Sequence, residues 1–196
     1  MKRLFDIIFS FLGLLVLLPL FALVALFIKF DSKGSVFYLQ ERIGKNGMPF
    51  TIIKFRTMKV NAEKNGLLSL GKYDKRITRT GAILRKRKID ELPQLINVLK
   101  GDMSLVGPRP EVKKYVDLYT EEQRRILQIK PGITDYASIK YIDEEQLLGA
   151  SENPEKTYIE EILPHKITLN LSYLERRNFF SDIKLIIISV LKMFRK

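Results

Sequence analysis

Residues 7–28 read IIFSFLGLLVLLPLFALVALFI, a run of 22 residues without a charged side chain. As a helix, this run is about 33 Å long, close to the thickness of the hydrocarbon core of a bilayer. A core helix of a soluble protein is seldom apolar on every side over that length. The large residues after the run do not fit the small-residue cleavage site of a signal peptide. The sequence therefore predicts a helix that inserts into a membrane.

Pro19 lies near the middle of this run. A proline inside a helix removes one hydrogen bond and clashes with the preceding turn, so we expect a kink. Lys2 and Arg3 precede the run and Lys29 opens a basic remainder, while such residues favour the cytoplasmic flank of a membrane segment. A hairpin bent at Pro19 places both flanks on that side, whereas a kinked spanning helix places only one there. The residues alone favour these two topologies equally.

The remaining bulk properties restrict the class of partner and of metal site. The chain has 196 residues, the size of one domain, and a net charge of +12. Such a charge favours anionic partners: phosphate-bearing ligands, anionic lipid or nucleic acid. A membrane segment and few aromatic stacking motifs argue against nucleic acid. With no cysteine and one histidine, any metal is expected to be a hard ion with oxygen ligands.

Strand and helix signals follow the apolar run. Residues 35–40 and 50–55 read as two strands joined by turn residues at 44–47. A helix is expected from Asp90 to Lys100, ended by Gly101. Further helices are expected over residues 120–128, 154–177 with a break near Pro164, and 183–194. The last one is basic and amphipathic, which suits a membrane surface or the protein's own core equally well.

Residues 85–94 read RKRKIDELPQ, so two adjacent carboxylates follow four cations. The simpler interpretation, which the residues alone favour, is a capped amphipathic helix with a solvated basic entry. The functional interpretation is phosphate chemistry. The helix N-terminus and the cations would lower the pKa of Asp90 and attract a diphosphate. Ionised Asp90 could then attack phosphorus, while Glu91 holds Mg²⁺.

Two later residues are further candidates. Residues 107–110 read GPRP, and the two prolines hold Arg109 in a stiff frame. A guanidinium is well suited to bidentate phosphate binding, although an exposed arginine in a plain proline turn is the alternative. Asp102 follows the expected helix end at Gly101 and could belong to a metal site or to an ordinary loop.

Seven motifs then follow one another along the chain. They are QERIG at 40–44, KFRTM at 54–58, RITRTG at 76–81, DELPQL at 90–95, NVLKGDMS at 97–104, VGPRP at 106–110 and KPGIT at 130–134. Together they resemble the bacterial sugar transferase family of small monotopic phosphoglycosyl transferases. The resemblance covers essentially the whole chain, and it favours the functional interpretation of Asp90, Glu91 and Arg109.

The resemblance implies an α/β fold that is mostly α. Residues 1–33 would form a re-entrant membrane helix broken at Pro19, where family members often have Ser-Pro and this chain has Leu18-Pro19. Residues 34–196 would form a small helical catalytic domain with a short β-hairpin and amphipathic interfacial helices. This domain would lie on the cytoplasmic face of the bacterial inner membrane, in contact with its lipids.

The resemblance also implies a two-step reaction that depends on Mg²⁺, with Mn²⁺ as the alternative ion. Asp90 would attack the sugar-linked phosphorus of a UDP-sugar and release UMP, and undecaprenyl phosphate would then accept the phosphosugar. This is a first membrane step of glycoconjugate assembly. Glu91 would hold the metal, with Asp102 as a second candidate ligand. The candidates for binding the donor phosphates are Arg85, Arg109, Lys54 and Arg56.

The chain departs from the family pattern at residues 135–141, which read DYASIKY where many members have GWAQVNGR. Because that loop is thought to help bind the nucleotide-sugar, the resemblance leaves the donor sugar open. Two other classes remain as alternatives. One is a basic membrane scaffold without catalysis, which would release no UMP. The other is a membrane-tethered nucleic-acid binder, which would bind DNA with a steep dependence on salt.

Overall fold

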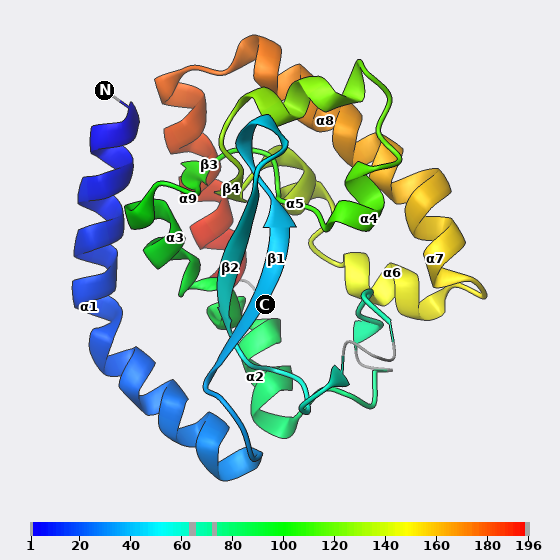
Figure 1. Cartoon of the computed structure of the whole chain (residues 1–196). Helices are drawn as coiled ribbons and strands as arrows, with labels where there is room; N and C mark the ends of the chain where they lie inside the picture. The colour runs from blue at the N-terminus through cyan, green and yellow to red at the C-terminus, as the bar shows by residue number, and fades with distance from the viewer. Residues whose placement is uncertain (1, 63–65, 72–73, 195–196) are drawn as a thin grey trace.

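The computed structural model describes residues 2–62, 66–71 and 74–194. Within these residues the fold is mostly helical, with two small two-stranded sheets and one long apolar helix at its N-terminal end (Figure 1). The first elements are α1 (Lys2–Asp31), β1 (Phe37–Ile43), β2 (Pro49–Phe55), α2 (Arg79–Lys86), the 3₁₀ turn η4 (Ile89–Glu91), α3 (Gln94–Lys100) and β3 (Ser104–Val106). Then come α4 (Lys113–Val116), η5 (Gln123–Gln128), β4 (Gly132–Thr134), α5 (Tyr136–Lys140), α6 (Glu144–Ala150), α7 (Pro154–Thr157), η6 (Tyr158–Ile162), α8 (Leu163–Arg176) and α9 (Phe179–Phe194).

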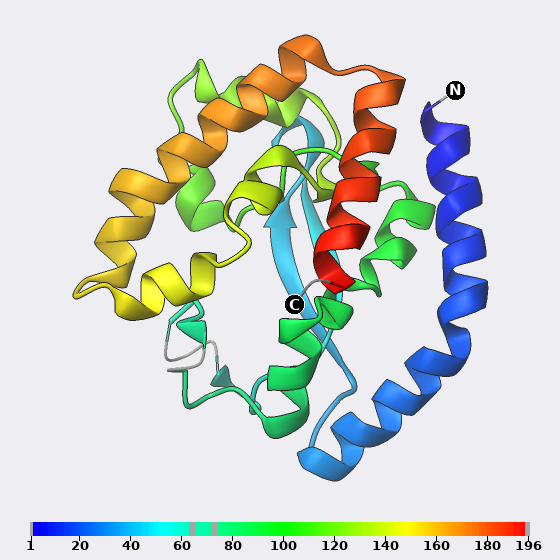
Figure 2. The same cartoon turned by 180° about the vertical axis from the view of Figure 1, so that it is seen from behind.

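Helix α1 is continuous over 30 residues, including Pro19. It is long enough and apolar enough to cross a membrane, and most of its large apolar side chains are exposed. Its axis changes direction about halfway along, as both views show (Figures 1 and 2). The chain thus stays helical through the proline, and its two arms meet at a bend.

The N-terminal arm of α1 is tied to the body of the molecule by polar contacts. The guanidinium of Arg3 donates hydrogen bonds to the carbonyls of Val98 and Leu99, at the end of α3, over 2.5 and 2.8 Å. The buried carboxylate of Asp6 accepts a hydrogen bond of 2.9 Å from the hydroxyl of Ser104. Charged groups would be costly in lipid, so these contacts place this end of α1 against protein.

The C-terminal arm of α1 is held by apolar packing. Val24 and Ile28 are almost fully buried and form one cluster with Phe55 of β2 and Leu84 of α2. Each such side chain removed from water contributes about 1.5–3 kcal/mol. Both arms of α1 therefore contact the same body, on either side of the bend.

Strands β1 and β2 form the expected antiparallel hairpin, with Phe37 paired to Phe55 and Ile43 to Pro49. The turn between them includes Asn46 and Gly47 at positive φ, which matches the turn chemistry of the sequence. The first strand covers residues Phe37–Ile43, whereas the sequence predicted residues 35–40. One face of the hairpin forms a wall of the site described below.

The short parallel strands β3 and β4 join two of the sequence motifs. Ser104 pairs with Gly132, and Val106 pairs with Thr134. At the end of this ladder, a Cβ atom on Gly132 would overlap the backbone of Gly107. Only glycine at position 132 therefore allows the two backbone segments to lie this close. This close approach fixes the GPRP segment against the KPGIT segment.

The structure corrects several expected helix boundaries. Asp90 and Glu91 lie on the 3₁₀ turn η4, and α3 begins only at Gln94, after Pro93. The cationic stretch before them contains a helix that the sequence analysis did not predict, α2, whose N-cap Thr78 accepts a hydrogen bond from the backbone N–H of Gly81. Gly101 ends α3 in the left-handed conformation, as expected.

Later in the chain, residues 123–128 are 3₁₀ rather than α-helix. Thr120 and Gln123 form reciprocal hydrogen bonds between side chain and backbone, the pattern of a capping box. The expected break near Pro164 is a π-helical turn of five residues, η6, directly before α8. The last helix, α9, lies beside the N-terminal arm of α1 in both views (Figure 2). The ring centroids of Phe5 and Phe179 lie 5.3 Å apart, in an edge-to-face arrangement.

Candidate active site

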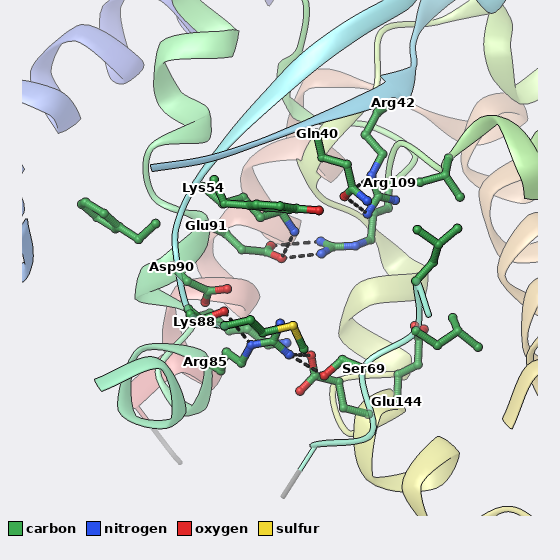
Figure 3. Close-up of a pocket in the computed structure, with 18 of the residues that line it drawn as sticks. Gln40, Arg42, Lys54, Ser69, Arg85, Lys88, Asp90, Glu91, Arg109 and Glu144 are labelled. Atoms are coloured by element: carbon green, nitrogen blue, oxygen red, sulfur yellow. Dashed lines mark hydrogen bonds and ion pairs between the residues drawn. The ribbon is translucent and has the colours of Figure 1, made fainter. Parts of the chain in front are cut away.

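The pair Asp90–Glu91 lines a cavity of about 680 Å³, within the range of small-molecule sites. Its walls come from β1 and β2, the segment after β2, α2 and η4, the GPRP segment, and the region of α5, α6 and α8. Lys88, in the left-handed conformation at φ 55°, reverses the chain between α2 and η4. This reversal turns Asp90 and Glu91 toward the interior (Figure 3).

Asp90 is 7% exposed, and its Oδ1 atom is buried with no hydrogen-bond partner among the described residues. Burial, followed by the charge of Glu91, raises the pKa of the Asp90 carboxyl, against the opposing charges of Lys54 and Arg85. This is the opposite of the lowering that the sequence analysis expected. The reason is that Asp90 lies inside a 3₁₀ turn away from water, and not at a solvated helix N-terminus.

Glu91 is held between two cations. Lys54 donates a hydrogen bond of 3.0 Å to Oε1, and Arg109 forms a bidentate pair, with Nη1 at 3.0 Å from Oε2 and Nη2 bonded to Oε1. Burial alone would raise the pKa of Glu91, but Arg109 and Lys54 lower it well below its ordinary value. Burial in turn lowers the pKa of Lys54 to about 8. The adjacent carboxylates thus have pKa values shifted in opposite directions, a common feature of catalytic pairs.

Arg85 lies on the other side of Asp90 (Figure 3). Its Nε atom donates to the hydroxyl of Thr57 over 2.8 Å, and its Nη1 atom pairs with Glu145 at 2.7 Å and with Ser69. A Cβ atom on Gly81 would overlap the Thr57 carbonyl, so α2 packs directly on the end of the KFRTM segment. The two motifs together therefore position Arg85.

Arg109 is positioned by the residues that follow the paired strands β3 and β4. Its backbone N–H donates to Oδ2 of Asp135 over 3.1 Å. The other oxygen of that carboxylate, which is 1% exposed, accepts from the N–H of Ser138 at 2.6 Å. Asp135 is the first residue of the divergent 135–141 segment, so this segment supports the arginine that clamps Glu91.

The structure does not bring two of the candidates to the pair. The guanidinium of Arg56 donates to the carbonyls of Ser32 and Lys33, and so ties down the end of α1. Asp102 follows α3, whereas Glu91 precedes it, and Asp102 accepts a hydrogen bond from the side chain of Asn97 at 3.2 Å. Since the length of α3 separates Asp102 from Glu91, one ion cannot bind both.

Other charged or polar residues line the cavity that the sequence did not mark as candidates, although Arg42 stands in the QERIG motif. Glu111 stands directly after the GPRP motif, so the sequence could have marked it as a candidate. Lys166 is a single lysine in a helix, and nothing in the sequence marks it. The residues are Arg42, Glu111, Glu144, Glu145, Tyr158 and Lys166.

A hard divalent ion fits this donor set in part. Asp90 offers a buried oxygen without a partner, and Glu91 is adjacent, but both oxygens of Glu91 already accept from cations. Among the described residues, no group of three or more Asp, Glu, His or Cys converges as a metal site. An ion here would draw its other ligands from water and from substrate phosphates, as Mg²⁺ usually does.

Comparisons with known proteins cover the whole chain. A family model described as "Bacterial sugar transferase" matches residues 1–196. The "Putative undecaprenyl-phosphate N-acetylgalactosaminyl 1-phosphate transferase" of Bacillus subtilis is 48% identical over 62% of this chain and 68% of its own. The "Uncharacterized sugar transferase EpsL" of the same organism is 40% identical over 98% and 87%. The "UDP-glucose:undecaprenyl-phosphate glucose-1-phosphate transferase" of Caulobacter vibrioides is 36% identical over 96% and 68%.

Proposed function

Because this chain belongs to the bacterial sugar transferase family, we propose that it transfers a phosphosugar from a UDP-sugar to undecaprenyl phosphate. The products are UMP and a polyprenyl-diphosphate-sugar, used in polysaccharide assembly. Relatives named for UDP-sugar and undecaprenyl-phosphate substrates support both partners. The donor sugar is left open, because these relatives differ in the sugar that they are named for.

One observation carries the proposal: two adjacent buried carboxylates face a cavity whose walls hold Lys54, Arg85 and Arg109. Three cations can bind a diphosphate, since phosphoryl chemistry needs its charge neutralised and its oxygens oriented. A carboxylate that lies beside such a group can act as a nucleophile. A scaffold without catalysis gives no reason to bury two acids together.

In the first step, a carboxylate oxygen of Asp90 attacks the phosphorus that bears the sugar. A bond forms between this oxygen and phosphorus, and the bond to the bridging oxygen of the diphosphate breaks. The bridging oxygen keeps the electron pair, so UMP leaves as an anion. The attack requires ionised Asp90; burial and the charge of Glu91 raise the pKa of this carboxyl, and the charges of Lys54, Arg85 and Lys88 oppose that rise.

In the second step, a phosphate oxygen of undecaprenyl phosphate attacks the same phosphorus. The bond to Asp90 breaks and the carboxylate is restored, so neither step needs net proton transfer. Arg109 keeps Glu91 ionised and oriented next to the reacting centre. When bound at Asp90 and Glu91, Mg²⁺ would supply positive charge to the diphosphate oxygens.

We also propose that α1 enters and leaves the membrane through the cytoplasmic leaflet. Support comes from its contacts, because Arg3 on one arm and Ile28 on the other both touch the same body. A helix that crossed the bilayer would carry Arg3 away from α3 by the full thickness of the hydrocarbon core. The re-entrant arrangement keeps both sets of contacts and leaves the bend of α1 in lipid.

The proposed function can be tested on the purified protein with donor alone. Intact-protein mass spectrometry should detect an added phosphosugar mass after incubation with a UDP-sugar, and the same sample should contain free UMP. An Asp90→Asn variant should show neither, while Asp117→Asn, at an exposed residue paired with Lys113, should behave as the original protein. If no UDP-sugar in a panel yields UMP, with or without undecaprenyl phosphate, the proposed function is wrong.

A further inference from the structure

The same cavity contains a second charged cluster that the transfer steps do not use. At its centre is Lys166 of α8, whose side chain is 6% exposed. Its Nζ atom lies 3.2 Å from Glu111 Oε1, 3.2 Å from the hydroxyl of Tyr158 and 3.1 Å from Glu144 Oε2. These contacts satisfy the three donors of the ammonium group, so Lys166 itself has no donor left for a ligand.

The two carboxylates of this cluster differ in what remains free. Glu111 accepts from Tyr158 at 2.6 Å and from Lys166 on Oε1, and its Oε2 lies 3.6 Å from Arg42. Glu144 is held by Lys166 on Oε2, and a quarter of its side chain is exposed. Glu144 is therefore the member that can accept hydrogen bonds from a molecule in the cavity, while Lys166 fixes its orientation.

The negative charge of Glu144 indicates which part of the UDP-sugar substrate it would face. The walls near Asp90 are cationic, as a diphosphate requires, and an unscreened carboxylate beside the phosphates would repel them. Hydroxyl groups are neutral donors, and a carboxylate acceptor is the group that dinucleotide-binding folds use for ribose hydroxyls. Tyr141, which is partly exposed, lines the cavity as well and offers apolar surface to the C–H face of a sugar ring.

We infer that Glu144, oriented by Lys166, is a specificity-determining residue that accepts hydrogen bonds from a vicinal pair of hydroxyl groups of the donor. The inference rests on the proposed function and adds to it the part of the cavity that binds a polyol. Such a pair occurs on the ribose of the nucleotide and on the transferred sugar. The two sources predict different kinetic results.

The test compares the original protein with Glu144→Gln, which keeps the size and one acceptor for Lys166 but removes the charge. UMP release is measured with UDP-glucose and UDP-N-acetylgalactosamine, and UMP and 2′-deoxy-UMP serve as inhibitors. For the better donor we expect KM to rise about tenfold with little change in kcat, which corresponds to about 1.4 kcal/mol of binding. The matched control is Glu160→Gln, whose side chain is exposed and lies 3.9 Å from the ammonium group of Lys156.

The inhibitors separate the two sources of hydroxyl groups. If Glu144 binds the ribose, UMP should inhibit the variant about tenfold more weakly than it inhibits the original protein. UMP and 2′-deoxy-UMP should then inhibit the variant equally. If Glu144 binds the transferred sugar, inhibition by UMP should stay the same, while the ratio of kcat/KM between the two donors changes. Unchanged KM, inhibition and donor ratio would overturn the inference.

Two further measurements exclude trivial explanations. The thermal unfolding temperature shows whether Glu144→Gln is folded, and Glu144→Asp, which keeps the charge, should recover part of the lost affinity. A fall in kcat alone, with KM and inhibition unaltered, would also contradict a role in binding. If the original protein releases no UMP from any donor, the proposed function fails; if it does and Glu144→Gln matches it, only this inference fails.

Discussion

At the scale of single residues, Asp90 and Glu91 show how much position matters for neighbours of nearly the same chemistry. The unpartnered oxygen of Asp90 is available to react, whereas both oxygens of Glu91 are engaged by Lys54 and Arg109. In the proposed mechanism, the first acid therefore attacks phosphorus and the second organises charge.

Asp90→Asn removes the negative charge and keeps the size of the side chain. Since the neutral amide cannot form the covalent intermediate, we expect turnover to fall by about 10³-fold or more. Initial rates of UMP release in the presence of undecaprenyl phosphate measure this. Near-normal rates in Asp90→Asn would exclude Asp90 as the nucleophile.

Removal of divalent ions should stop the reaction, and Mg²⁺ or Mn²⁺ should restore it. The physical reason is that Lys54 and Arg109 also pair with Glu91, so their charge is shared with that carboxylate and offsets only part of the diphosphate charge. Titration of the ion into chelated enzyme gives the half-maximal concentration, which Glu91→Gln should raise about tenfold or more, the usual size of a lost ligand interaction. Full activity in excess EDTA would contradict the metal proposal.

The sequence indicated the adjacent acids Asp90 and Glu91 and the arginines near them, because Asp90, Glu91 and Arg109 stand in long motifs and Arg85 stands in the cationic run before the acids. It did not indicate Lys166 or Glu144, which come together only when α6 and α8 pack around the cavity. It also suggested that Arg56 binds the donor phosphates, whereas the guanidinium of Arg56 donates a hydrogen bond to the chain just after α1. Local sequence carries the type of a residue, whereas its partner depends on tertiary packing.

At the scale of elements, the short helices were harder to predict than the strands. The hairpin had alternating β-formers and a clear turn. Helix α2 has a Thr78 cap, but its many cations read as a solvated loop. The turn η4 replaces the first turn of the expected helix, with the N–H of Leu92 donating to the carbonyl of Ile89 three residues back, and α3 starts only after Pro93. Boundaries of this kind are set by a few competing local hydrogen bonds.

For α1, cysteine labelling can distinguish a re-entrant helix from a spanning one, since the chain has no cysteine of its own. We expect single cysteines at Lys2 and, separately, at Glu160 to resist an impermeant maleimide in intact spheroplasts and to react after lysis. Both sites lie on the same side if α1 returns through one leaflet. Labelling of the Lys2 site alone before lysis would mean that α1 spans the membrane.

At the scale of the whole molecule, the cavity is built from segments that are far apart in the chain and joined by buried charges. Glu111, just after the GPRP segment, connects Arg42 of β1 with Lys166 of α8 and Tyr158 of η6. The sequence could not predict this junction, because each contact spans tens of residues. A buried ionic junction is sensitive to the loss of one partner, which leaves the other charge uncompensated.

Glu111→Gln should therefore lower the free energy of unfolding by about 3 kcal/mol at pH 7. Burial alone would raise the pKa of Glu111, but Lys166 and Arg42 lower it below the ordinary 4.5. A lowered pKa stabilises the fold above pH 4.5, and this stability is lost as the pH falls through the lower, folded-state value. Thermal unfolding of both proteins in detergent should show the difference narrowing as the pH drops below about 4.5. A difference that is constant between pH 7 and pH 4 would show that the charge of Glu111 is not responsible.

The contact between Lys2 and Asp182, 2.5 Å long and 180 residues apart in the chain, has a consequence for biosynthesis. At typical rates of translation, roughly 10–40 s pass between the emergence of α1 from the ribosome and that of Asp182. During that interval α1 lacks its partner Asp182, and only segments made earlier, such as α2, α3 and β3, can hold it. If α1 inserts into the bilayer as proposed, we expect its orientation to remain changeable until α9 docks. Premature termination upstream of α9 should release chains of mixed orientation, which the cell's quality control would have to remove.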